Sequence, residues 1–286
     1  MRYAAALKEI ANWVLPPRIQ EEVGNRLLWR ATLRAEVRKH LAKNRRFRGI
    51  HAGKRCFILC NGPSVNAENL APLAREICFS VSNFYKHPLY EQVRPRYHCV
   101  PSVLPPHTDE EITAWFQEMH QATLEATVFL SSRQAPLIRR QHLFPARDVT
   151  FVHMGAGFIP NPRNIDISRG VVRVQSVPIM CLVIALYMGF GEIYLLGTDH
   201  CSLWTGEYNY SFERKDLVLK DPYTDGNGRN NYSLTLEFQT HLRLWEQYQA
   251  LHEIAAGRGV RIVNLAQESR LDVFPRGSLA EVLVGS

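Results

Sequence analysis

Short apolar runs alternate with helical patterns along most of the chain, and each run ends at a turn of polar or glycine residues. Apolar runs of this kind, flanked by helical segments, are typical of buried strands in a parallel sheet. The pattern therefore predicts an α/β fold with a mostly parallel sheet. The predicted strands cover residues 55–60, 77–82, 97–103, 127–131, 149–153, 192–196 and 260–264.

Helical patterns fill most of the intervals between these runs. Thr108 followed by Glu111 is a capping box, which predicts a helix that begins at residue 108. Gly189-Phe190-Gly191 predicts the end of an apolar helix that starts at Ser176. The predicted helices cover residues 66–75, 108–124, 176–188, 234–256 and 278–283, and the Gly-, Pro- and Asn-rich residues 155–164 are predicted to form a loop.

The chain divides into two predicted parts. Residues 1–50 are expected to form a basic, helical N-terminal extension that is broken at Pro16-Pro17 and ends in a linker over residues 44–49. Residues 51–286 are expected to form the α/β domain. Within it, residues 201–232 are rich in aromatic, Gly and Asn residues and lack a clear period, which favours a lid or binding loop, with disorder as the alternative.

The net charge of +7 belongs to the N-terminal part. Residues 1–55 contain 14 Lys and Arg against 4 Asp and Glu, whereas the rest contains 20 against 23. No motif that reads nucleic acid accompanies this charge, so nucleic acid is not the expected partner. An amphipathic segment on an anionic membrane surface fits the pattern, with a solvated helical pair packed on the domain, or a protein partner, as the alternatives.

Composition and cysteine usage predict a cytoplasmic protein, and the basic N-terminal part adds a peripheral position at the inner membrane as an option. Hydrophobic residues make up 46% and charged residues 21% of the 286 residues, and no apolar run approaches the ~18 residues of a membrane span. Lys8 and Glu9 interrupt the first apolar stretch, so a secretory signal is not expected. The six cysteines lie in apolar runs without metal-binding spacing, which predicts reduced core residues.

The strongest candidate site follows the first predicted strand, where the chain reads Asn61-Gly62-Pro63-Ser64. In an open α/β sheet, ligands bind beyond the carboxyl ends of the strands, where turns leave backbone N–H groups free. Gly62 allows a close approach of the backbone, and Asn61 and Ser64 add polar side chains. The turn favours a nucleotide-phosphate or nucleoside site, and a purely structural turn is the alternative.

A second polar cluster, Thr198-Asp199-His200, follows the strand at residues 192–196. A neutral histidine near a carboxylate can act as a general base, so Asp199 and His200 are candidate catalytic residues. His241 on the long helix is a further candidate. The chain has no Asp-x-Asp pair and no Gly-x-Ser-x-Gly, so neither a bound metal nor a serine hydrolase is implied.

Four blocks taken in order resemble one superfamily: CFILCNGPS at 56–64, VSNFY at 81–85, GFGEIYLLGTD at 189–199 and SRLDVFPR at 269–276. They resemble the bacterial sialyltransferases of glycosyltransferase family 42 and the related proteins known as 6-hydroxymethylpterin diphosphokinase MptE-like or motility-associated glycosyltransferases. This resemblance implies a Rossmann-like, mostly parallel sheet with helices on both faces and a lid inserted after the Gly-Thr-Asp strand.

The resemblance also implies roles for individual residues. Residues 61–64 would contact the nucleotide, Asn83 would face the cytidine or phosphate, and Ser176 would lie near the donor. Tyr208 and Tyr210 would match the lid tyrosines that hold the donor phosphate. In this chain, only His241 lies near the position of the family's catalytic base histidine, and the residues that surround that histidine in the family are not present. His200 stands where the family has an aromatic residue.

These expectations combine into one leading function and two alternatives. The leading function is a metal-independent glycosyltransferase without a cofactor, which transfers an acidic sugar from a CMP-sugar to a surface glycan or a lipid-linked acceptor. The first alternative is a pterin diphosphokinase, which would need magnesium and a carboxylate cluster. The second is a non-catalytic nucleotide-binding or scaffold protein that has lost the base. The sequence does not identify the acceptor or the oligomeric state.

Overall fold

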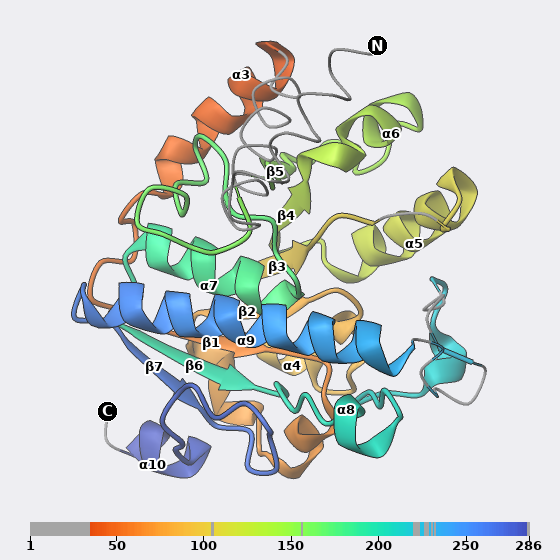
Figure 1. Ribbon diagram of the computed structural model, residues 1–286. Coiled ribbons are helices and arrows are strands. Elements are labelled where there is room, and N and C mark those ends of the chain that lie inside the picture. The colour runs from red at the N-terminus through yellow and green to blue at the C-terminus, as the bar shows by residue number, and fades with distance from the viewer. Residues whose placement is uncertain are drawn as a thin grey trace, which may run out of the picture.

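Seven parallel strands form the sheet in the computed structural model, which describes residues 35–103, 106–155, 157–219, 224, 225, 229, 231 and 233–284. All strand pairs in the described sheet are parallel, and the spatial order is β5-β4-β3-β2-β1-β6-β7 (Figure 1). The strands are β1 (Arg55–Leu59), β2 (Cys78–Val81), β3 (Tyr97–Val100), β4 (Thr127–Ser131), β5 (Thr150–Val152), β6 (Glu192–Leu196) and β7 (Arg261–Asn264). The predicted α/β fold class is confirmed.

The order of the strands reverses at β1. Strands β2 to β5 extend the sheet on one side of β1, whereas β6 pairs with its other side, with Leu59 opposite Leu196. A sheet with this order has a crevice between the carboxyl ends of the two strands where the direction of winding changes. The turn after β1 and the turn after β6 therefore lie side by side.

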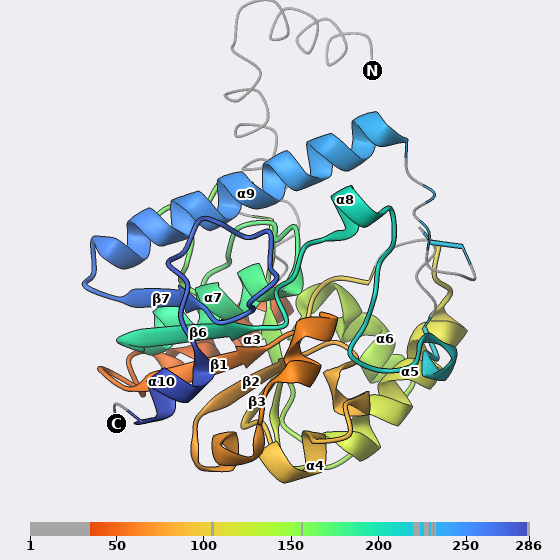
Figure 2. The ribbon, with the colours of Figure 1, turned by 90° about the horizontal axis from the view of Figure 1, so that it is seen from below.

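Helices cover both faces of the sheet (Figure 2). Alternate residues of β1 point to opposite faces, so Cys56 and Ile58 join one hydrophobic core while Phe57 and Leu59 join the other. The first core contains α7 (Val177–Met188) and part of α9 (Leu234–Ala256). The second contains residues of α4 (Tyr90–Val93), α5 (Asp109–Ala122), α6 (Ala135–Arg140) and α10 (Leu279–Val284).

The helix boundaries largely follow the sequence signals. Thr108 and Glu111 form the predicted capping box, with the Glu111 N–H donating to Thr108 Oγ1 at 3.2 Å and the Thr108 N–H to Glu111 Oε2 at 2.9 Å. Helix α7 ends at Gly189, which has a left-handed φ of 83°. The apolar surface of α7 is buried along almost its whole length, which explains why it has no polar face.

The helix predicted over residues 66–75 is wrong. Two short 3-10 helices, Pro63–Ala67 and Ala71–Arg75, occupy this region, and the backbone at Glu68 between them is extended. Pro72 cannot donate the backbone hydrogen bond that a continuous helix would need at that position. The chain between β1 and β2 is therefore a pair of tight turns.

The linker predicted over residues 44–49 is also wrong. Helix α3 (Ala35–Lys43) continues into a 3-10 helix over Asn44–Phe47, and Asn44 and Phe47 are buried. Asn44 Nδ2 donates to the carbonyl oxygens of Phe151 at 2.7 Å and Ile167 at 2.9 Å. This segment is thus part of the folded domain.

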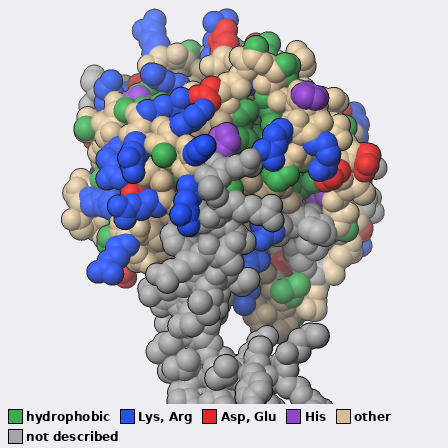
Figure 3. Space-filling view, turned by 90° about the horizontal axis from the view of Figure 1, so that it is seen from above, with side chains coloured by type: hydrophobic (Ala, Val, Ile, Leu, Met, Phe, Trp, Pro, Cys, Tyr) green, Lys and Arg blue, Asp and Glu red, His purple; other side chains and the backbone are tan. Residues whose placement is uncertain are grey.

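The surface on the side of α3 is basic. Figure 3 views the molecule from this side and shows many Lys and Arg side chains with few Asp and Glu among them. The predictions for residues 1–34, including the helical pieces and the contact with anionic lipid, lie outside the described residues. No helix in the described part of the chain is both long and apolar enough to cross a membrane.

Candidate functional site

A cavity of about 1100 Å³ opens at the carboxyl ends of β1 and β6. This is slightly more than the ~300–1,000 Å³ that is common for ligand pockets, so the cavity has room for a ligand of nucleotide-sugar size. Nine of the twelve predicted site residues line it, namely Asn61, Gly62, Pro63, Ser64, Ser176, Thr198, Asp199, His200 and Tyr208. The reversal of strand order at β1 is what brings these distant segments together.

Backbone hydrogen bonds join the two turns beyond the ends of the strands. The Cys60 N–H donates to the Leu196 carbonyl and the Gly62 N–H to the Gly197 carbonyl, both at 2.9 Å. A Cβ atom on Gly62 would lie 2.5 Å from the Gly197 carbonyl oxygen and 2.6 Å from Asp199 Cγ. Only glycine fits at position 62, so the close contact of the turns depends on it.

Asp199 connects the turns through its side chain. Its Oδ2 atom accepts a hydrogen bond from the Ser64 N–H at 2.9 Å, and its Oδ1 atom accepts one from the Ser64 hydroxyl. Burial raises the pKa of Asp199, although both hydrogen bonds from Ser64 act in the opposite direction. With both carboxylate oxygens engaged, Asp199 is placed to position the 61–64 turn.

Two polar atoms of the cavity residues have no protein partner among the described residues. They are Asn61 Oδ1 and Ser176 Oγ, and both are buried. Ser176 is the N-cap residue of α7, yet its hydroxyl makes no capping hydrogen bond. Because buried polar atoms nearly always have partners, these two atoms mark a place where a ligand would supply them.

Thr198 has a supporting position in the cavity wall. It is buried, and its hydroxyl donates to Asn264 Oδ1 at the end of β7 at 3.1 Å. The Thr198 carbonyl accepts a hydrogen bond from Ser269 Oγ at 2.5 Å. These contacts tie the turn after β6 to the segment that follows β7.

His200 lines the cavity in a left-handed backbone conformation with a φ of 50°. Its Nε2 atom lies 2.9 Å from the Tyr248 hydroxyl, and its ring centroid lies 5.7 Å from that of Trp245. Burial, with a smaller contribution from His241, lowers the pKa of His200 to about 4. The imidazole is therefore neutral at physiological pH.

His241 is not among the residues that line the cavity. Its Nδ1 atom lies 2.9 Å from the Glu237 carbonyl oxygen one turn earlier in α9, so Nδ1–H donates to that carbonyl. Its ring lies beside Trp245, with centroids 6.1 Å apart, and Trp245 also contacts His200. Both histidines thus contact Trp245, but of the two His200 is the one that lines the cavity.

Two other predicted residues lie outside the cavity lining. Asn83 Oδ1 accepts a hydrogen bond from Trp115 Nε1 at 2.6 Å, which connects the end of β2 to α5. Tyr210 stacks on Phe212 with ring centroids 5.2 Å apart, and its ring centroid also lies 5.1 Å from that of Tyr208. Of the two lid tyrosines, Tyr208 is the one that reaches the cavity.

The described part of the lid is attached to the turn after β1. The Ser211 N–H donates to the Asn61 carbonyl at 2.8 Å, and Asn66 Nδ2 donates to the Ser211 carbonyl at 3.2 Å. Helix α8 (Ser202–Thr205) begins the lid next to His200. The backbone of Asn61 is thus fixed by the lid, while its side-chain oxygen remains without a partner.

Two arginines of the cavity were missed from the sequence. Arg133 follows β4, and Arg173 precedes α7. Neither side chain has an ion pair or a hydrogen bond with another described residue. The rule that pointed to Asn61, a polar residue just after a strand, could have found Arg133, whereas Arg173 lies in an irregular stretch that carries no such signal.

No group of three His, Cys, Asp or Glu side chains among the described residues is arranged to hold a metal ion. The six cysteines are unpaired, and five of them are buried, as the sequence predicts for core residues. Cys201 is the half-buried one and lines the cavity. Metal independence remains a prediction.

No protein-family model and no curated protein sequence matches the chain significantly. Among solved structures, the chain is similar to the sialyltransferase CstII from Campylobacter jejuni in complex with cytidine-5'-monophosphate, at 17% identity over 79% of this chain and 85% of that chain, with a TM-score of 0.47.

Two further structures are similar to the chain. The MAf glycosyltransferase from Magnetospirillum magneticum AMB-1 has 17% identity over 84% of this chain and 38% of that chain, with a TM-score of 0.46. A mammalian sialyltransferase in complex with Gal-beta-1-3GalNAc-ortho-nitrophenol has 14% identity over 73% of this chain and 69% of that chain, with a TM-score of 0.35.

Proposed function

We propose that the protein is a glycosyltransferase that transfers an acidic, sialic-acid-like sugar from a CMP-activated donor to a surface glycan or a lipid-linked acceptor. The observation that carries this proposal is the pair of buried, unpartnered atoms Asn61 Oδ1 and Ser176 Oγ in the cavity between β1 and β6. Such atoms are costly in an empty protein and are satisfied by a polar ligand.

The nucleotide end of the donor is assigned to the 61–64 turn and the start of α7. The Asn61 amide offers an acceptor and two donors, which suits the edge of a pyrimidine base. Ser176 lies at the N-terminus of α7, where the helix dipole favours a phosphate. Asp199 and Gly62 hold the turn in the position that this binding requires.

The charge of an acidic sugar fits the two arginines. Arg133 and Arg173 bring guanidinium groups without a carboxylate partner to the cavity. A guanidinium binds a carboxylate or a phosphate through paired, charge-assisted hydrogen bonds. Tyr208 also lines the cavity, and its hydroxyl is assigned to the phosphate oxygen that carries the developing charge as CMP departs.

His200 is assigned as the group that receives the proton of the acceptor hydroxyl. In the transfer step, the acceptor oxygen forms a bond to the anomeric carbon, the bond from that carbon to the phosphate oxygen breaks, and CMP leaves with the electron pair. The imidazole is neutral because its pKa is lowered to about 4, and Tyr248 fixes the ring. The lid would keep water from the oxocarbenium-like centre.

A non-catalytic nucleotide-binding protein is the second candidate. The observation that favours it is the geometry of the two histidines: Nε2 of His200 is already bonded to Tyr248, and His241 does not line the cavity. Donor binding without turnover would distinguish this candidate. For either function we propose a location at the cytoplasmic face of the inner membrane, through the basic N-terminal residues.

The test is thermal stabilisation of the full chain by CMP, CDP, UDP, GDP and ATP, each with and without magnesium, followed by turnover assays with CMP-sialic acid. A ligand that binds only the folded state raises the melting temperature. We expect a shift with CMP that does not depend on magnesium, and release of CMP from the donor. A shift with ATP and magnesium alone would replace the proposal with the diphosphokinase, and a CMP shift without turnover would replace it with the non-catalytic protein.

A further inference from the structure

A second cavity, of about 470 Å³, lies at the other end of α7 from the candidate functional site. Ser176 and Val177 at the start of α7 line the first cavity, whereas Leu186 and Tyr187 near its end line the second. A helix of this length spans about 18 Å, so the two cavities are separate. The second cavity is called the arginine pocket here, after its charged lining of Arg48, Arg163, Asp166, Arg169 and Arg258.

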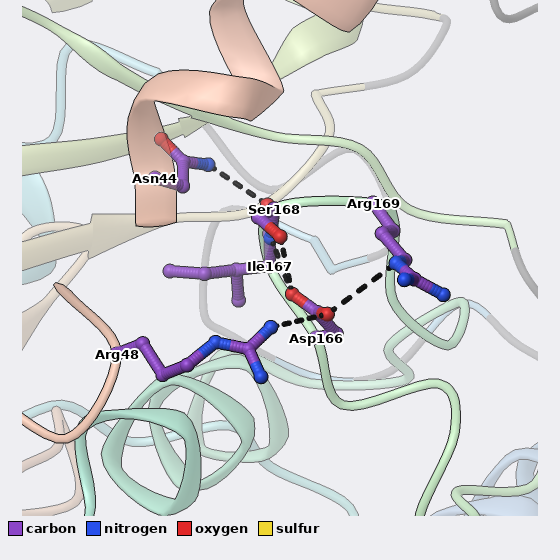
Figure 4. Close-up of polar contacts among 6 residues, drawn as sticks. All are labelled: Asn44, Arg48, Asp166, Ile167, Ser168 and Arg169. Carbon is purple, nitrogen blue, oxygen red and sulfur yellow. Dashed lines mark hydrogen bonds and ion pairs between the residues drawn. The ribbon is translucent and has the colours of Figure 1, made fainter. Parts of the chain in front are cut away.

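The carboxylate in the arginine pocket, that of Asp166, already pairs with two of the arginines. Asp166 Oδ2 lies 2.7 Å from Arg48 Nη2 and 3.6 Å from Arg169 Nε, so the two arginines reach it from two sides (Figure 4). Asp166 Oδ1 accepts hydrogen bonds from the N–H and the hydroxyl of Ser168. One carboxylate thus faces four arginines, and the pocket keeps an excess of positive charge.

Two arginines in the pocket have no partner for their charge. The side chains of Arg163 and Arg258 make no ion pair and no hydrogen bond with any other residue that the structure describes. Arg163 and Arg258 are exposed at the mouth of the pocket, and burial lowers the pKa of Arg258. Two guanidinium groups without a carboxylate partner at one pocket favour an anionic ligand.

Capping of the neighbouring helix ends does not explain these arginines. The carbonyls of Tyr187 and Met188 at the end of α7 accept the backbone N–H groups of Gly49 at 3.1 Å and His51 at 2.9 Å. The Ala255 carbonyl at the end of α9 accepts the backbone N–H groups of Arg258 and Val260, both at 2.9 Å. Backbone donors therefore satisfy these helix ends without help from the guanidinium groups.

A buried hydroxyl points to a ligand independently of the charges. Tyr187 is only 7% exposed and lines the arginine pocket; its phenol oxygen accepts from the Arg48 guanidinium, and its O–H proton has no acceptor among the described residues. The Arg48 guanidinium lies over the face of the Tyr187 ring, 5.2 Å from its centroid. A phenol hydroxyl is a good donor to an anionic oxygen.

We propose that the arginine pocket binds a phosphate group, held by the guanidinium groups of Arg163 and Arg258 and by the hydroxyl of Tyr187. Planar guanidinium groups pair with phosphate oxygens through two hydrogen bonds each, and the phenol supplies a further donor. The phosphate belongs either to a free phosphoanion or to the head group of an anionic phospholipid. The four arginines that line the pocket would draw either one towards it.

The test compares the full chain with the variants Arg163→Gln/Arg258→Gln and Tyr187→Phe. Lys54→Gln/Arg75→Gln removes the same two charges at exposed positions that do not line the arginine pocket, and so controls for overall charge. Binding of inorganic phosphate is measured by calorimetry, and binding to phosphatidylglycerol and phosphatidylcholine vesicles by sedimentation. Unfolding curves without ligand confirm that each variant is folded.

We expect Arg163→Gln/Arg258→Gln to weaken binding at least tenfold and Tyr187→Phe severalfold, with Lys54→Gln/Arg75→Gln close to the wild type. A loss seen with inorganic phosphate identifies a soluble phosphoanion site, and a loss seen with phosphatidylglycerol vesicles alone identifies a head-group site. Equal losses in the two double variants, or an unchanged Tyr187→Phe, would mean general charge attraction and would overturn the proposal, as would unchanged binding in all variants.

Discussion

The carboxylate of Asp199 accepts hydrogen bonds from both the backbone N–H and the hydroxyl of Ser64, two residues that belong to the turns after β6 and β1. This contact is the side-chain connection between the two halves of the nucleotide site. Burial raises the pKa of Asp199, so ionisation of its carboxyl costs the folded state more than the unfolded state.

The pH dependence of stability follows from that shift. Asp199 contributes stability that is fully present below its ordinary pKa of 3.8 and is lost as the pH rises through the raised value. The free energy of unfolding of the wild type should therefore fall, relative to Asp199→Asn, as the pH rises above 3.8 and through the raised pKa of Asp199. Urea unfolding at several pH values measures this, and a difference that instead grows with pH would show that the Ser64 hydrogen bonds outweigh burial.

Gly62→Ala should destabilise the protein and abolish nucleotide binding. The added Cβ would meet the Gly197 carbonyl oxygen at 2.5 Å, and overpacking of this kind costs about 1–3 kcal/mol. Gly257→Ala is the matched control, because its Cβ would lie at an ordinary 3.4 Å from its nearest neighbour, the Glu253 carbonyl oxygen. Thermal unfolding of the two variants checks this; equal stability would show that the turns can separate without cost.

Asn61→Ala and Ser176→Ala should weaken CMP binding without loss of stability. Asn61 Oδ1 has no partner among the described residues, and the Ser176 hydroxyl acts only on the hydroxyl of Tyr248, so removal of either should cost the fold little. Each lost hydrogen bond to the ligand should cost about 1–2 kcal/mol, or roughly a 5- to 30-fold weaker affinity. Calorimetric titration with CMP measures the effect, and unchanged affinity in both folded variants would remove the nucleotide role of this cavity.

His200→Asn should lower turnover of the CMP-sugar at least about 100-fold, as expected for loss of a general base. Asparagine tolerates the left-handed backbone found at this position, where φ is 50°. His241→Asn should change turnover by less than about tenfold, since His241 does not line the cavity. Initial rates of CMP release measure the turnover of both variants. A larger loss in His241→Asn than in His200→Asn would assign the proton transfer to His241.

Asn44→Ala should destabilise the fold by about 1–3 kcal/mol, because two buried carbonyls, those of Phe151 and Ile167, would lose their donor. Arg45→Ala, at the exposed neighbouring position, is the control and should have little effect. Chemical unfolding compares the two. Similar stability in both variants would mean that water replaces the amide at these carbonyls.

Much of the fold was predictable because its signals are local. The seven apolar runs and the capping box at Thr108 depend on neighbouring residues, and all of them appear in the structure. The predicted helix at residues 66–75 failed where Pro72 overrides the apolar pattern. Asn44 was assigned to a linker because its partners lie more than 100 residues away.

The candidate site was only partly predictable for the same reason. The position of a polar residue after a strand identified Asn61 and Asp199 separately. That these two residues lie in the same cavity depends on the pairing of β1 with β6, which cannot be predicted from the sequence of either strand alone. Arg173 could not be found in this way, because an irregular segment carries it to the cavity.

The position of Asn44 also bears on whether the sheet of one molecule can pair with the sheet of another. Strand β5 is an outer strand of the sheet, and an unprotected outer strand offers free backbone groups to the sheet of another molecule. The Asn44 side chain donates a hydrogen bond to the Phe151 carbonyl on that strand, and α3 packs beside β5. A shortened protein that begins at residue 51 would lack this cover and would be prone to edge-to-edge association and aggregation.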